Sequence, residues 1–214
     1  MYDFGQEQRP LTPQERWAGG VFLAVLVGLF VAEVVHDYHP VKLSGLLIAL
    51  FWIPLLALHE AGHAVAAAML NWHVSRVVIG MGRIIGSFRV GCAAVEIRLF
   101  PVEGFVSSAP RDLRRPRLKN ACIYFAGPGV ELLLAVVILL VIGPDRLLTR
   151  TEDYGLIGWQ SLAAASAAQG VLNLIPRSLR TPHGDIPNDG LGIIRSFRRP
   201  DRYYADMIRH TRHG

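Results

Sequence analysis

The sequence predicts an α-helical polytopic membrane protein with about four transmembrane helices and a small β-ribbon inserted between the second and the third. Three observations lead to this fold class. Apolar residues make up 51% of the 214 residues, and charged residues make up only 18%, below the quarter that is typical of soluble domains. The apolar residues are gathered in four blocks. Between the second and third blocks, the pattern changes to an alternation of apolar and polar residues.

Each apolar block has about the length that a helix needs to cross a bilayer core roughly 30 Å thick. The fourth block is rich in Ala, Ser and Gln, which suit close packing inside a helix bundle. We therefore expect a leader over 1–16, a membrane-embedded core over 17–176 and a loop with a basic tail over 177–214. The predicted spans are about 17–35, 43–72, 120–143 and 157–176.

The distribution of basic residues predicts the orientation. Nine Lys and Arg residues lie in the connection 71–119 and eight in the segment from Arg177 onward. The positive-inside rule places this connection and both termini in the cytoplasm, as expected for a multi-pass protein of the cell membrane. We interpret the basic run 111–119 as an anchor beside anionic lipid headgroups. No reader domain for nucleic acid is recognisable, so the lipid bilayer, and not nucleic acid, is the expected partner.

The connection between the second and third spans contains strand patterns. Residues 95–99 alternate with a period of two, and the short apolar runs 77–79 and 84–85 are separated by glycines. These features predict a β-ribbon over about 74–108 at the cytoplasmic membrane surface. An amphipathic surface loop is the alternative interpretation.

The second span contains the motif His59-Glu60-Ala61-Gly62-His63. Residues i and i+4 share one face of a helix, so His59 and His63 can bind one Zn²⁺ ion. Glu60 is then placed to act as a general base. Ionisable groups at membrane depth are costly and indicate a functional site. A hydrogen-bonded polar contact between helices is the simpler alternative.

Together with three later motifs, this motif resembles the site-2 proteases, a family of intramembrane zinc metalloproteases. The segment 125–131, Phe-Ala-Gly-Pro-Gly-Val-Glu, is similar to the Ala-Gly-Pro-x-x-Asn segment of that family. Asn173-Leu-Ile-Pro176, followed by Asn188-Asp-Gly190, is similar to its Asn-x-x-Pro and Asp-Gly signature. The glycine-containing stretch 100–106 resembles the ribbon that follows the metal helix in the family.

The resemblance implies one Zn²⁺ per chain, bound by His59, His63 and Asp189, with Glu60 as the catalytic base. Asp185 and His183 are competing candidates for the third ligand, and the glycine that follows Asp189 favours Asp189. Asn173 resembles a family residue that binds the substrate backbone or the oxyanion. Glu131 stands where the family carries Asn, and we expect it to lie close to the metal ligands or to make a hydrogen bond between helices.

The function implied by the resemblance is hydrolysis of a peptide bond within or near a transmembrane segment of a membrane-protein substrate. Single-span regulators and leftover signal peptides are the substrate types that the family suggests. A catalytically silent relative that acts as a membrane adaptor or chaperone is the alternative.

Overall fold

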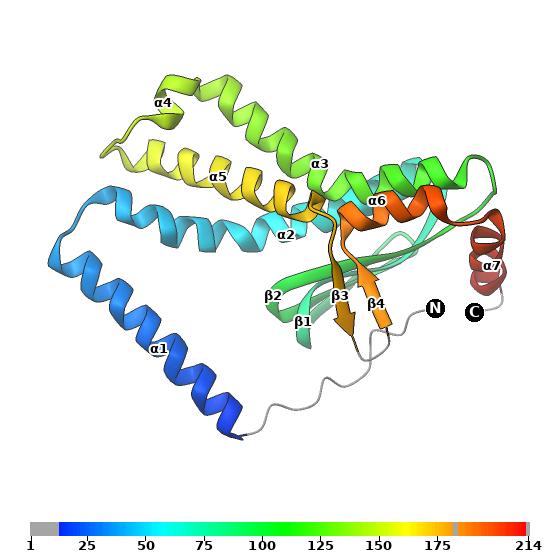
Figure 1. Ribbon diagram of the computed structural model, residues 1–214, viewed down its shortest axis with the longest axis horizontal. Helices are drawn as coiled ribbons and strands as arrows, with labels where there is room; N and C mark the ends of the chain where they lie inside the picture. The colour runs from blue at the N-terminus through cyan, green and yellow to red at the C-terminus, as the bar shows by residue number, and fades with distance from the viewer. Residues whose placement is uncertain (1–12, 182–183, 213–214) are drawn as a thin grey trace.

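The computed structural model of the protein describes residues 13–181 and 184–212. Figure 1 shows a group of long helices, with a curved β-ribbon and a short hairpin on one side of them. In chain order, the elements are α1 (Pro13–His36), the 3-10 helix η1 (Pro40–Lys42), α2 (Leu43–Met69), β1 (Trp72–Val90), β2 (Ala93–Pro110), α3 (Pro116–Ile142), α4 (Pro144–Leu148), α5 (Tyr154–Leu174), β3 (Ser178–Thr181), β4 (Gly184–Pro187), α6 (Asp189–Arg198) and α7 (Asp201–Arg212).

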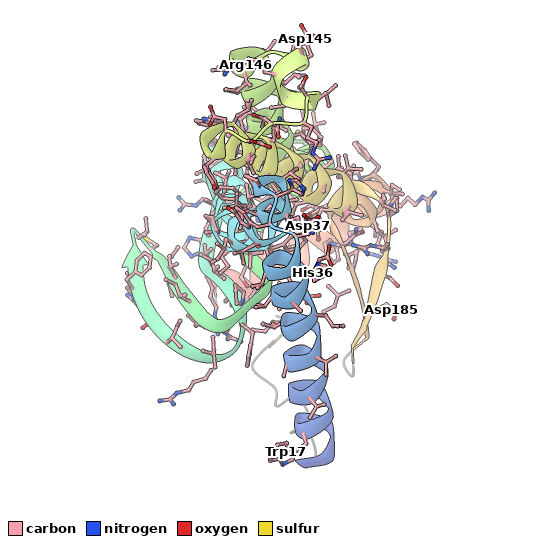
Figure 2. The ribbon with its side chains drawn as sticks, turned by 90° about the vertical axis from the view of Figure 1, so that its left-hand side faces the viewer. Trp17, His36, Asp37, Asp145, Arg146 and Asp185 are labelled. Carbon is pink, nitrogen blue, oxygen red and sulfur yellow. The ribbon has the colours of Figure 1, made fainter. Side chains whose placement is uncertain are left out.

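The helices α2, α3 and α5 pack against one another and form the centre of the molecule. Glycines permit their close approach. A Cβ atom at Gly62 of α2 would lie 2.7 Å from the carbonyl oxygen of Ala126 in α3, and one at Gly170 of α5 would lie 2.8 Å from Leu132 Cγ. By contrast, α1 extends away from the other helices in Figure 1, and Figure 2 places the exposed Trp17 near its far end.

The prediction of four transmembrane helices is wrong. Among the described residues, two helical segments are long and apolar enough to cross a membrane, Pro40–Met69 and Pro116–Ile142. The described ranges form seven α-helices rather than four. The fourth predicted span corresponds to α5, whose buried residues include Ser161, Ser166 and Gln169. These polar residues lower its hydropathy, and they suit a helix that packs against protein rather than lipid.

The connection between α2 and α3 forms a long antiparallel pair of strands, β1 and β2, over 72–110. The strands bend back on themselves, so Val77 is paired with Val106 on one side and with Val95 on the other. Gly80 lies in the bend with φ +94°, and a Cβ atom there would meet the carbonyl oxygen of Phe100 at 2.9 Å. Glycine is thus required at this bend because other residues rarely adopt positive φ.

Glu96 holds neighbouring segments of the ribbon together. Its carboxylate accepts hydrogen bonds from Arg76 at 2.8 Å and from Arg98 at 3.0 Å. The hydrogen bonds from Arg76, followed by that from Arg98, lower the pKa of Glu96 below its ordinary value despite partial burial. The ribbon therefore carries an anionic Glu96 between two guanidinium groups at neutral pH.

The segment after α5 is more ordered than the predicted loop and tail. It forms the β3–β4 hairpin and the helices α6 and α7. Tyr204 of α7 is fully buried in a cluster with Ala67 of α2, Trp72 of β1 and Ile123 of α3. This cluster fixes the C-terminal helices against the end of α2, where the chain enters the ribbon.

Candidate metal centre

The two histidines of α2 are buried and lie one helical turn apart. Their Nε2 atoms are 3.0 Å from each other, and the exposed fractions of His59 and His63 are 5% and 7%. Glu60 lies between them in sequence and is also buried. The two histidines and Glu60 are therefore buried side chains of a helix that is apolar enough to cross a membrane.

Asp189, the first residue of α6, supplies the third group. Its Oδ2 atom lies 3.0 Å from His59 Nε2, and its Oδ1 atom lies 3.3 Å from His63 Nε2. Burial raises the pKa of Asp189, but the contacts with the two imidazoles outweigh burial and lower this pKa to about 2. One ligand atom from each of the three residues lies within 4.8 Å of the others.

The other predicted candidates lie elsewhere. Asp185 is an exposed residue of β4, and Figure 2 shows it on the hairpin, outside the helical core. His183 lies outside the described residues. Asn173 lies in the last turn of α5 and is half-buried, and its carbonyl oxygen accepts a hydrogen bond from Asn188. Two aspartates were candidates for the third ligand. Asp189 lies beside the histidines, and Asp185 does not.

Asn188 joins the end of α5 to the start of α6. Its Nδ2 atom donates to the carbonyl oxygens of Asn173 at 3.0 Å and Ile175 at 2.7 Å. Its Oδ1 atom accepts from the backbone N–H groups of Arg177 at 2.8 Å and Leu191 at 3.2 Å. The bond from Leu191 makes Asn188 the N-cap of α6. The Asn188 side chain therefore fixes the start of α6 at Asp189.

We expect Asn188→Ala to lower the free energy of unfolding by about 2 kcal/mol, because it removes a helix cap and the hydrogen bonds to α5. The matched variant Asn188→Ser keeps a cap oxygen and loses the two donated bonds, so its loss should be smaller. Thermal unfolding of the detergent-solubilised protein measures both. Parental stability in Asn188→Ala would contradict this assignment.

One face of α3 borders the two histidines. The carbonyl oxygen of Ile123 accepts a hydrogen bond from His63 Nδ1 at 2.6 Å. Glu131 is fully buried, and its Oε2 atom lies 3.1 Å from His59 Nδ1. Between them, Gly127 leaves room for the rings, since a Cβ atom there would lie 2.7 Å from His59 Nε2 and even closer to His63 Nε2.

The ribbon covers Glu60. A Cβ atom at Gly104 of β2 would lie 2.6 Å from Glu60 Oε1, so the strand backbone runs directly against this carboxyl group. The other oxygen, Oε2, is buried and has no hydrogen-bond partner among the described residues. Glu60 therefore has one oxygen against the ribbon and one left for another interaction.

Sequence reasoning missed the supporting roles of Asn188, Gly127 and Ile123. Asn188 carries a recognisable signal, because Asn before an acidic residue and an apolar turn is a common helix start. The spacing of Gly127 four residues before Glu131 also indicates a shared helix face. The carbonyl of Ile123 carries no signal, since any residue would supply it.

The donor set fits a zinc ion. Two imidazole nitrogens and one carboxylate are the ligands of many catalytic zinc sites, which leave a fourth position open. His63 Nδ1 is engaged by a carbonyl group, so Nε2 is the nitrogen left for a metal. The Oε2 atom of Glu60, which is buried and has no hydrogen-bond partner among the described residues, also fits a site that takes a polar ligand.

Comparison with known proteins matches residues 46–149 to the model of peptidase family M50. The match covers α2 from residue 46 onward, the ribbon and α3, and it ends before Asp189. The zinc metalloprotease Rip1 of Mycobacterium tuberculosis is 30% identical over an alignment of 146 residues that covers 58% of this chain and 36% of that protein. The chloroplastic membrane metalloprotease ARASP of Arabidopsis thaliana is 31% identical over an alignment of 100 residues that covers 41% of this chain and 22% of that protein.

These matches confirm the resemblance to the site-2 proteases. Rip1 is described as a zinc metalloprotease and ARASP as a membrane metalloprotease, and the cluster of His59, His63 and Asp189 agrees with a zinc cofactor. The aligned part spans 22% of the length of ARASP and 36% of the length of Rip1.

Proposed function

We propose that this chain, whose match to peptidase family M50 identifies it as a relative of the site-2 proteases, is an intramembrane zinc metalloprotease. Its substrate would be a membrane protein, cleaved within or near a transmembrane segment. The observation that carries the proposal is the approach of Asp189 to His59 and His63, which lie in a helix long and apolar enough to cross a membrane. A metal centre beside a membrane-spanning helix would act on a peptide bond within the membrane.

In this proposal, His59, His63 and Asp189 hold the ion, and Glu60 moves the proton. Zinc, when bound, polarises the scissile carbonyl and makes water a nucleophile near neutral pH. Glu60 accepts a proton from the attacking water as the oxygen bonds to the carbonyl carbon. It then delivers this proton to the amide nitrogen as the carbon–nitrogen bond breaks. The burial of Glu60 and its unpartnered Oε2 atom support this role.

The membrane placement follows from charge and packing. The segments Pro40–Met69 and Pro116–Ile142 would cross the membrane of the cell. The nine basic residues of the connection 71–119 favour the cytoplasmic side for the ribbon. Because α6 packs on α3 and α7 contacts β2, the C-terminal helices would lie on that side too. The predicted cytoplasmic N-terminus lies outside the described residues and stays a prediction.

The ribbon is the proposed site for an unwound substrate. A peptide bond inside a helix is protected by the hydrogen bonds of that helix, so the substrate must open locally before it is cleaved. A strand of the ribbon could hold the opened segment by strand addition. The approach of Gly104 to Glu60 supports this assignment, because it places the strand backbone beside the proposed base. Asn173 remains a weaker candidate for a substrate contact.

The test is the zinc content of the purified full chain together with cleavage of a single-span test substrate. We expect about one zinc per chain in the parent, and loss of zinc and of cleavage in His59→Ala and Asp189→Asn. Asp185→Asn is the matched control, because the same change four residues away should alter neither quantity. Loss of zinc in Asp185→Asn, or a parent that binds no zinc, would overturn the proposal.

A further inference from the structure

The side of α3 that faces α2 presents three groups to the histidines at a regular spacing. Ile123, Gly127 and Glu131 are four residues apart, so they lie in a row along one helix face. Their contributions differ: a backbone carbonyl oxygen, a gap where a side chain would stand, and a carboxyl group. The row runs alongside the pair His59 and His63, which have the same spacing of four.

Each histidine turns its Nδ1 atom toward this row and its Nε2 atom toward Asp189. For His63, the hydrogen bond to the carbonyl of Ile123, at 2.6 Å, fixes the ring. For His59, Oε2 of Glu131 faces Nδ1 at 3.1 Å, at an angle that falls short of a hydrogen bond. The described residues give neither atom another hydrogen-bond partner.

We infer that this face of α3 orients both metal-binding imidazoles and that Glu131 is the positioning residue for His59. The inference rests on the proposed zinc site and adds to it a determinant of metal affinity. A carboxylate that accepts from the outer nitrogen of a metal-binding histidine fixes the ring and makes it a better ligand. The full burial of Glu131 supports this role, because a buried carboxyl group needs a polar partner and the atom that faces it is His59 Nδ1.

The experiment measures the zinc dissociation constant of the full chain in detergent, by competition with a chromophoric chelator. Glu131→Gln keeps the shape and an acceptor oxygen but removes the charge, and we expect about tenfold weaker binding. Glu131→Met keeps the approximate volume and removes the acceptor, and we expect up to about 100-fold weaker binding, the upper end for changes beside metal ligands. The melting temperature of the zinc-free protein is measured in parallel.

Ser166→Ala is the matched control. Ser166 is a fully buried polar residue of the neighbouring helix α5, and its loss should leave the dissociation constant unchanged. If Glu131→Gln and Glu131→Met bind zinc within twofold of the parent, the inference is wrong. If Glu131→Met does not fold, Glu131→Gln alone decides. A purely structural role would lower the melting temperature of the zinc-free protein and leave the dissociation constant of the folded fraction unchanged, which also contradicts the inference. Failure of the parent to bind zinc would instead overturn the proposed function.

Discussion

Glu60→Gln should retain about one zinc per chain and lose about 10²–10⁴-fold in the rate of cleavage. The amide has nearly the shape of the carboxylate, so packing against Gly104 is preserved. It cannot accept a proton at neutral pH, however, and general-base catalysis contributes a factor of this size. Zinc content is measured on the purified variant, and cleavage is measured with a single-span test substrate in detergent or reconstituted membranes.

The matched control is Glu152→Gln, the same change at an exposed residue between α4 and α5. It should leave zinc content and cleavage near parental values. Cleavage by Glu60→Gln at the parental rate would remove Glu60 from the mechanism. A parent that binds zinc but does not cleave the test substrate, while Glu60→Gln leaves the cellular phenotype intact, would favour the silent adaptor.

Gly127→Ala should abolish high-affinity zinc binding, weakening it by at least about 100-fold. A methyl group at this position would overlap both imidazoles, 2.7 Å from His59 Nε2 and 2.6 Å from His63 Cε1. These are ring atoms of side chains packed between two helices, so they have little space to move. Either the rings leave the position from which they contact Asp189, or α2 and α3 separate. The zinc dissociation constant and thermal unfolding distinguish these two results.

Gly129→Ala tests whether any added methyl group in α3 has the same effect. A Cβ atom at Gly129 would meet the edge of the Phe125 ring at 3.0 Å, and Phe125 is about half exposed. That ring can turn aside, so zinc binding should stay within about twofold of the parent. An equal loss of zinc affinity in both variants would show that α3 tolerates no added methyl group in this region. It would contradict a specific role of Gly127.

The local part of the site was predictable from the sequence, because the spacing of His59 and His63 alone places both on one helix face. The approach of Asp189 was predictable only through the family resemblance. No rule of spacing says that a residue 130 positions after His59 returns to it. In the structure, the β3–β4 hairpin and the Asn188 cap link the end of α5 to the start of α6, and this link brings Asp189 to the histidines.

The number of membrane spans was predicted less well than the site. Block length treated α5 as equal to α2 and α3, although its polar residues face protein in the folded chain. Hydropathy along a sequence reports composition, and it does not report which face of a helix meets lipid. The segment after α5 was predicted as a loop and a basic tail because its prolines and arginines were given more weight than the helical spacing of apolar residues in α6 and α7.

The proposed metal ligands come from two places far apart along the chain, and this separation bears on when the centre can form during synthesis. A ribosome that has released only α2, the ribbon and α3 has produced both histidines but not Asp189. The centre can therefore close only after α6 has emerged and docked on α3. Once formed, an ion held at both places would tie a loop of 130 residues, and the entropy of that closure rises only slowly with loop length. A chain synthesised only as far as α5 would thus lack the third proposed ligand, so we expect no metal centre before α6 is made.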